Sequence, residues 1–270
     1  MVTAVNFTQE MDLLYRPYKF EELLELSYYV QEYWSSCFII VPIYLLLILV
    51  GKAYMKTRKG FNLQKPLILW SFSLSVFSIL GAVRTWSYMG TLWHQYSPKH
   101  TVCFSFYTST SVIKFWSSIF TFSKVIELGD TAFIILRKRP LIFVHWYHHS
   151  TVLMFASFGM KQKVPAGGWF MTMNFGVHAI MYSYYTLKAA QVKPPKILPM
   201  LITSLQILQM AVGVSVSIMA YIWRQDYGCF MTEHALFWSA VLYTSYFILF
   251  AHFFHRTYII PKSKAKVKSQ

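Results

Sequence analysis

Four histidines stand inside long apolar stretches of the sequence, where ionisable side chains are costly and rare. They are His145, His148, His149 and His178. The first three follow the helical spacing i, i+3, i+4, so they share one face of a helix. Imidazole groups gathered in this way can bind a metal, transfer protons or attack a carbonyl carbon. The sequence therefore predicts a chemical site within the apolar part of the chain.

Further polar side chains occur in apolar stretches at intervals of three or four residues. They are Lys124, Glu127, Asp130 and Thr131 in one stretch, Asn174, His178 and Tyr182 in a second, and Thr203, Gln206 and Gln209 in a third. Helical spacing places most of each group on one face of its helix. Each such face must contact protein or water, because unsatisfied polar groups are costly in lipid.

These polar residues share one depth in the predicted bilayer. Glu127, His149, His178 and Gln206 each stand ten residues from a basic residue near the end of the stretch, namely Arg137, Arg139, Lys188 and Lys196. A helix rises about 1.5 Å per residue, so each of the four lies roughly 15 Å inside the membrane surface on the basic side. The pattern predicts a polar chamber formed by four helices and reached from the basic side.

Each group also has a structural or metal-binding interpretation. Gln206 and Gln209 suit hydrogen bonds between helices as well as they suit catalysis. Lys124, Glu127 and Asp130 suit a buried ion-pair network. A His-x-x-His-His run also occurs in membrane di-iron enzymes, but those need more histidines than this chamber holds. A single zinc ion is geometrically possible, yet no hydrolytic or oxidative motif accompanies it, and we expect neither a metal nor another cofactor.

The elements that position these residues are membrane helices. Of the 270 residues, 56% are hydrophobic and only 13% are charged, and the mean hydropathy is +0.40. A soluble domain carries about a quarter charged residues, so a soluble enzyme, a disulfide scaffold and a disordered chain are poor fits. We predict an all-α polytopic membrane protein with seven transmembrane helices, given ~20 residues per span. The spans are 34–51, 67–90, 115–136, 141–158, 168–187, 197–223 and 235–255.

The distribution of basic residues predicts the orientation. The net charge of +15 is concentrated in alternate connections, which hold 16 of the 25 Lys and Arg residues and no Asp or Glu. Such loops face the cytosol. Because the positive charge is concentrated in loops between membrane spans, it argues against nucleic-acid binding. We therefore expect a lumenal N-terminal tail at 1–33, a transmembrane domain at 34–258 and a cytosolic basic tail at 259–270. The first 33 residues lack the apolar core of a signal peptide.

Three local features agree with this topology. Asn6-Phe7-Thr8 is a glycosylation sequon that requires a lumenal N-terminus. Lys266 and Lys268 resemble a cytosolic di-lysine retrieval signal for the endoplasmic reticulum, the alternative being a basic tail beside anionic lipid. Cys103 and Cys229 both fall in lumenal loops, where a disulfide is chemically permitted. That pairing is a hypothesis.

The ordered motifs resemble those of a known family. Lys-x-x-Glu-x-x-Asp-Thr, His-x-x-His-His, Asn-x-x-x-His-x-x-Met-Tyr-x-Tyr-Tyr and Thr-x-x-Gln-x-x-Gln occur in the order and spacing typical of very-long-chain fatty acid elongases, the ELO family of 3-oxoacyl-CoA synthases. The match covers about 30–260, and the context of the histidine run is similar to that of animal members using saturated and monounsaturated acyl-CoAs.

The resemblance implies a fold, substrates and partners. Six of seven spans would form a barrel around an acyl tunnel in the endoplasmic reticulum membrane. A long-chain acyl-CoA and malonyl-CoA would react by a ping-pong route through a histidine acyl-enzyme, without a redox cofactor. Association with a ketoreductase, a dehydratase, an enoyl reductase and other elongases is also implied. The alternative function is a non-enzymatic seven-helix lipid receptor or transporter.

The residues take hypothetical roles in this chemistry. We expect His148 to attack the acyl thioester, with His178 as the second choice of nucleophile. His149 or His145, oriented by Glu127 or Asp130, would tune the His148 tautomer or take its proton. His178 and Asn174, with Gln206 or Gln209, would hold the malonyl enolate. Lys124 would bind a carboxylate or phosphate, or simply neutralise Glu127, and Tyr182 would support the site.

Overall fold

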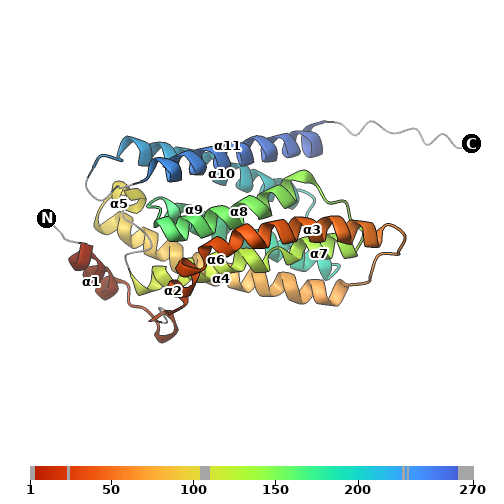
Figure 1. The fold of residues 1–270 in the computed structure, drawn as a ribbon, viewed down its shortest axis with the longest axis horizontal. Coiled ribbons are helices and arrows are strands. Elements are labelled where there is room, and N and C mark those ends of the chain that lie inside the picture. Colours follow the sequence, from red (N-terminus) through yellow and green to blue (C-terminus); the bar gives the residue numbers. More distant parts are fainter. Residues whose placement is uncertain (1–3, 23–24, 104–109, 227–228, 230, 261–270) are drawn as a thin grey trace, which may run out of the picture.

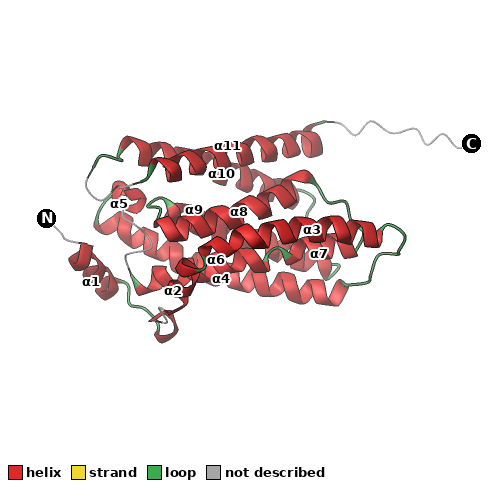
Figure 2. Ribbon diagram, in the orientation of Figure 1, coloured by secondary structure: helices red, strands yellow, loops and turns green. Residues whose placement is uncertain are grey.

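The computed structural model describes residues 4–22, 25–103, 110–226, 229 and 231–260. Throughout this part of the chain the regular structure is helical and contains no strand (Figure 2). The longer helices run lengthwise beside one another, as Figure 1 shows. The all-helical class predicted from the sequence is therefore confirmed.

The helices follow one another in this order: α1 (Ala4–Leu14), the 3₁₀ turn η1 (Lys19–Glu22), α2 (Glu25–Glu32), the 3₁₀ turn η2 (Trp34–Ser36), α3 (Cys37–Met55), α4 (Gln64–Gln95), α5 (Pro98–Cys103), α6 (Ser111–Ile126), α7 (Gly129–Leu136), α8 (Phe143–Gln162), α9 (Gly167–Ala189), α10 (Leu198–Ile222), α11 (Glu233–Phe254) and the π-helical turn η4 (His255–Ile259).

Four helices of the described chain are long and apolar enough to cross a membrane: Trp34–Met55, Gln64–Gln95, Leu198–Ile222 and Glu233–Ile259. Helical segments also lie at the other three predicted spans, where α6 with α7, α8 and α9 carry the polar residues that lower their hydropathy. A crossing by all seven segments, six of them arranged as a barrel, stays a prediction. On α3 the side chain of Leu47 is 62% exposed and that of Leu49 67%, as expected of a lipid-facing surface.

The third predicted span is not one continuous helix. Helix α6 ends at Ile126 and α7 begins at Gly129. Between them the N–H groups of Asp130 and Thr131 donate to the carbonyls three residues back, at 3.1 and 3.2 Å, instead of four back. Gly129 allows a close approach here, because a Cβ at this position would lie 2.6 Å from the Trp70 ring. The predicted span 115–136 therefore consists of two helices joined by a short 3₁₀-type turn.

One disulfide connects two distant parts of the described chain. The structure joins Cys103, the last residue of α5, to Cys229 by a disulfide. Cys37 is buried and not bonded to another cysteine. The sequence analysis left the Cys103–Cys229 pairing as a hypothesis, and the structure contains it.

The N-terminal segment folds against the bundle instead of extending as a polar tail. Its Glu21 side chain is fully buried and accepts four hydrogen bonds. Arg84 of α4 donates two of them, from Nε at 2.9 Å and Nη2 at 2.6 Å. Trp116 of α6 and the Tyr18 backbone N–H donate the others, at 2.7 and 2.8 Å. This carboxylate therefore anchors the segment to two helices at once.

We expect Glu21→Gln to lower the free energy of unfolding by about 3 kcal/mol, because it leaves the Arg84 guanidinium without its charged partner. Thermal unfolding of the detergent-solubilised protein measures the loss. Glu22→Gln, one residue along and exposed, is the matched control and should be neutral. Equal stability of the two variants would show that the buried ion pair does not anchor the segment.

The same carboxylate predicts a pH dependence. Burial raises the pKa of Glu21, but the hydrogen bonds from Arg84, Tyr18 and Trp116 together lower it by more, so that it lies below its usual 4.5. A carboxyl with a lowered folded-state pKa stabilises the fold above its unfolded pKa and loses that contribution as the pH falls through the folded value. The stability gap between wild type and Glu21→Gln should therefore narrow below about pH 4.

Candidate active site

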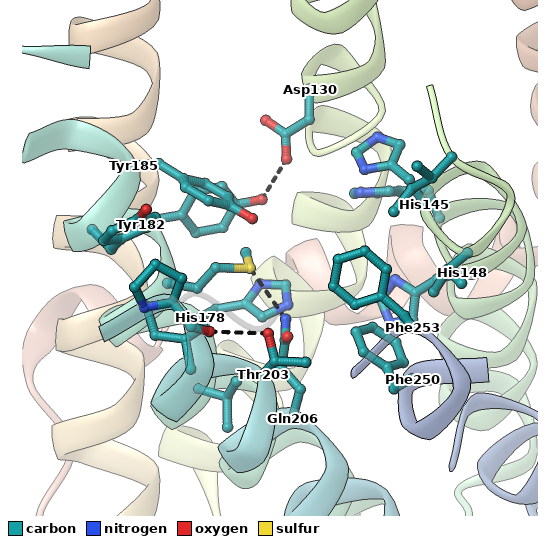
Figure 3. Close-up of a pocket in the computed structure, with 18 of the residues that line it drawn as sticks. Asp130, His145, His148, His178, Tyr182, Tyr185, Thr203, Gln206, Phe250 and Phe253 are labelled. Carbon is teal, nitrogen blue, oxygen red and sulfur yellow. Dashed lines mark hydrogen bonds between the residues drawn. The ribbon is translucent and has the colours of Figure 1, made fainter. Parts of the chain in front are cut away.

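A cavity of about 460 Å³ opens between α7, α8, α9 and α10, with α4 and α11 completing its wall. Polar side chains from the predicted groups line it, and Figure 3 labels seven of them. They are Asp130, His145, His148, His149, Asn174, His178, Tyr182, Thr203, Gln206 and Gln209. Residues from four helices, separated by up to 79 positions (130 to 209), thus meet around one space.

The α8 histidines differ in how they are held. The Nε2 of His145 lies 2.9 Å from the Thr131 hydroxyl, which in turn contacts the Tyr44 hydroxyl at 2.7 Å. The His145 and His149 rings lie 4.4 Å apart between centroids. His149 is buried, and its Nδ1 has no hydrogen-bond partner among the described residues. His148 packs beside the Tyr246 ring at 5.0 Å and faces the cavity (Figure 3).

A chain of polar contacts fixes the other histidine. The Lys124 Nζ donates to the Asn174 Oδ1 at 2.8 Å. The Asn174 Nδ2 therefore faces the His178 Nε2, at 3.2 Å, and donates to it. Because Nε2 accepts, a neutral His178 carries its proton on Nδ1. That nitrogen lies 3.8 Å from the Glu127 Oε2, an oxygen without a hydrogen-bond partner among the described residues.

Lys124 and Glu127 lie behind the cavity wall and not on it. They form an ion pair at 2.7 Å, and the Lys124 side chain is only 2% exposed. Ser123 also donates to Glu127, at 3.1 Å. A buried ammonium requires such a partner, since an unpaired buried charge is strongly destabilising. Of the two predicted roles for Lys124, the structure therefore favours neutralising Glu127 over binding a substrate phosphate.

The Asp130 carboxylate is directed away from the histidines. It accepts hydrogen bonds from the Trp70 Nε1 and the Tyr182 hydroxyl, each at 2.7 Å. Figure 3 shows it pointing toward the side of the cavity where Tyr182 lies, across from His145. Both hydrogen-bond partners belong to α4 and α9, so the orienting role expected of Asp130 toward His145 or His149 stays a prediction. The contact that the structure gives His145 is with the Thr131 hydroxyl.

The α10 glutamines occupy different positions. The Gln206 Nε2 lies 3.5 Å from the Met181 sulfur, a weak contact that leaves its amide facing the cavity (Figure 3). Gln209 is buried, with 6% of its side chain exposed. Both amides can donate to an oxyanion in the cavity.

A second, narrower cavity of about 50 Å³ continues from the first. Four residues line both: His148, Asn174, Gln209 and Met210. Beyond them the wall is almost wholly apolar, with residues such as Phe155, Phe170 and Met171. His148 therefore lies between the cavity that carries the predicted polar side chains and a smaller one with an apolar wall.

Sequence reasoning missed several residues of this site. Tyr246 and Phe250 of α11 flank His148, at 5.0 and 6.2 Å between ring centroids. Their spacing with Tyr243, at i, i+3, i+7, was the available signal, but aromatic residues are frequent throughout the chain. Arg137 and Arg139 also line the larger cavity, although the sequence analysis used them only for topology.

No group of three or more His, Cys, Asp or Glu side chains within the described ranges has an arrangement suited to a metal ion. The cavity instead combines imidazoles, amide donors and two guanidinium groups at its margin. This set suits a nucleophile that takes an acyl group beside donors that stabilise an oxyanion.

Comparisons with known proteins cover the whole chain. The model of the ELO family, described as the GNS1/SUR4 family, matches residues 29–266. "Very long chain fatty acid elongase 3" of Homo sapiens is 67% identical over 270 residues, all of this chain and all of that protein. The Mus musculus protein of that name is 62% identical, again over the full length of both. "Very long chain fatty acid elongase 6" of Homo sapiens is 45% identical over 92% of this chain and 94% of its own.

The ion pair behind the cavity predicts a coupled effect on stability. Lys124→Met should lower the free energy of unfolding by about 3 kcal/mol, because Glu127 is left buried and unpaired. Glu127→Met should lower the free energy of unfolding by a similar amount. The loss in the double variant should be about 2 kcal/mol smaller than the sum of the two single losses. Unfolding by SDS in mixed micelles measures the free energy of unfolding of each variant. Lys161→Met, exposed on α8, is the control. Additive losses would contradict the pairing.

Proposed function

The chain belongs to the ELO (GNS1/SUR4) family, and we propose that it is a condensing enzyme of fatty acid elongation. A long-chain acyl-CoA and malonyl-CoA would give a 3-oxoacyl-CoA two carbons longer, with release of CO₂ and CoA. The names of its relatives support the elongase role. The geometry of the site supports the reaction type.

The observation that carries this proposal is the position of His148 between the two cavities. A thioester carbonyl beside this imidazole would have its CoA moiety in the larger, polar cavity and its acyl chain in the apolar one. Arg137 and Arg139 on the wall of the larger cavity would attract the CoA phosphates. The narrow cavity would admit a chain as its flexible methionines, Met171 and Met210, change rotamer.

The first half-reaction would transfer the acyl group to the enzyme. An imidazole nitrogen of His148 attacks the thioester carbon, the C–S bond breaks, and CoA leaves as a thiolate. The imidazole loses its N–H proton to that thiolate, so that a neutral acyl-imidazole and free CoA result. Packing against Tyr246 would hold the His148 ring in place for the attack.

The second half-reaction would form the carbon–carbon bond. Malonyl-CoA loses CO₂, and the electron pair of the broken bond enters an enolate. Asn174 directs one Nδ2 proton at His178 and has a second available for the enolate oxygen, while Gln206 or Gln209 supplies a further donor. The enolate carbon attacks the acyl-imidazole, the C–N bond breaks, and His148 takes a proton to regenerate the enzyme.

We also propose the location and partners that the sequence predicts. The enzyme would lie in the endoplasmic reticulum membrane with its N-terminus lumenal and its C-terminus cytosolic, near the ketoreductase, dehydratase and enoyl reductase of the cycle. Asn6, in α1, would be glycosylated. Lys266 and Lys268, the proposed retrieval signal, lie outside the described residues.

The test uses purified protein and palmitoyl-CoA without malonyl-CoA. About one CoA per protein should be released in a burst, as expected of a covalent intermediate, with an acyl mass on the peptide that contains His148. His148→Ala should abolish the burst and the condensation. His94→Ala, exposed near the end of α4, is the matched control and should behave as wild type.

Three outcomes would contradict parts of the proposal. Condensation by His148→Ala at the wild-type rate would exclude His148 as the nucleophile. An acyl adduct on His178 would identify His178 as the nucleophile instead. If no burst of CoA and no acyl adduct were found while malonyl-CoA was still consumed, both substrates would have to bind together. No consumption of malonyl-CoA with CO₂ release would favour the lipid receptor or transporter.

A further inference from the structure

Helix α3 forms no part of the cavity wall, yet one of its side chains is connected to the candidate active site. Of the described residues that line the two cavities, none belongs to α3. Tyr44 of this helix is only 6% exposed and shares an apolar cluster with Ile48 and with Ile135 of α7. Its hydroxyl lies 2.7 Å from the Thr131 Oγ1, and that oxygen lies 2.9 Å from the His145 Nε2. Two hydroxyl groups thus connect a helix outside the cavity to a histidine on its wall.

The number of protons in this Tyr44–Thr131–His145 relay determines the direction of its hydrogen bonds. Tyr44 and Thr131 each carry one hydroxyl proton and can also accept. If Tyr44 donates to Thr131 and Thr131 donates to the His145 Nε2, both protons have acceptors. Every other direction leaves a hydroxyl proton without an acceptor among the described residues. Both hydroxyl-bearing residues are buried, and an unsatisfied buried donor is costly.

This direction fixes the position of the proton on His145. Because its Nε2 accepts from Thr131, the neutral ring carries its proton on Nδ1. His145 can therefore donate a hydrogen bond, but it can take a proton only if both hydroxyl groups reverse. The ring of His149 lies 4.4 Å away between centroids, and its Nδ1 has no hydrogen-bond partner among the described residues. His149 is thus the neighbour that is left for proton transfer.

We infer that Tyr44 is a positioning residue of the active site, which acts through Thr131 to hold the His145 proton on Nδ1 and makes His145 a hydrogen-bond donor in the reaction. This inference rests on the proposed function, because it gives His145 a part in the condensation. The sequence leaves two roles open for His145, to tune the His148 tautomer or to take its proton. A fixed donor fits only the first, so the proton transfer falls to His149.

The first measurement is the tautomer of His145. Ring-nitrogen NMR of full-length protein with isotope-labelled histidine distinguishes Nδ1–H from Nε2–H, and His145→Gln identifies the His145 signals. Wild type should show Nδ1–H. Tyr44→Phe should lower the ratio of Nδ1–H to Nε2–H by about fivefold, the factor that corresponds to one net hydrogen bond. Tyr54→Phe, which removes an exposed hydroxyl from the same helix, is the matched control and should leave the tautomer unchanged.

The second measurement is the condensation of palmitoyl-CoA with malonyl-CoA by the same variants. Tyr44→Phe should lower kcat by about fivefold with KM unchanged, because Tyr44 lines neither cavity. Thr131→Val should lower kcat further, since it removes the whole relay. The double variant should match Thr131→Val alone, because Tyr44 acts only through Thr131. Thr131→Ser keeps the hydroxyl and should retain both the wild-type tautomer and the wild-type kcat.

The possible results separate the inference from the proposed function. A wild-type His145 that carries its proton on Nε2 would overturn the inference, and this result requires no variant to fold. An unchanged tautomer and kcat in Tyr44→Phe and Thr131→Val would also overturn it, and the proposed function would stand. If wild-type protein failed to condense the two CoA substrates although His145 showed Nδ1–H, the proposed function would fail instead, and with it the role of His145 in the reaction.

Discussion

The geometry of the site depends on how the chain neutralises one ammonium group inside the bundle. Lys124 is buried between Glu127 of its own segment and Asn174 of α9. The contact with Lys124 fixes which end of the Asn174 amide faces His178, and so fixes the proton on that imidazole. Removal of this cation would free the amide to rotate. A charge behind the cavity wall therefore determines which hydrogen-bond donors face the cavity.

Much of this arrangement could be predicted from the sequence, because lipid imposes a strong rule. Polar residues within apolar helices must meet one another, and the helical spacing of His145, His148 and His149 shows on which face they do so. Equal distance from the basic loops then places four such faces at one depth. These two arguments locate the cavity without any knowledge of how the helices are ordered around it.

The rest depends on contacts between residues far apart in the chain. The turn at Glu127–Leu128 contains no proline and follows an uninterrupted helical pattern, so spacing alone predicts a straight helix there. The close approach of the Trp70 ring to Gly129 and the hydrogen bond from Tyr182 to Asp130 are visible only in the structure. Burial of Glu21 is equally invisible in sequence, since its partner Arg84 lies 63 residues away and inside a predicted span.

The ion pair between Glu21 and Arg84 has a consequence for biosynthesis. Arg84 lies within an apolar helix, six residues from the end of the predicted span 67–90, and a charged side chain within a span is costly to insert. Glu21 leaves the ribosome first, so it is already on the far side of the membrane, in the predicted topology, when α4 arrives. Pairing of the two then lowers the cost of integrating α4. In the predicted topology the N-terminal segment would thereby assist the insertion of a later helix of its own chain, and shortening it would reduce the yield of correctly inserted protein.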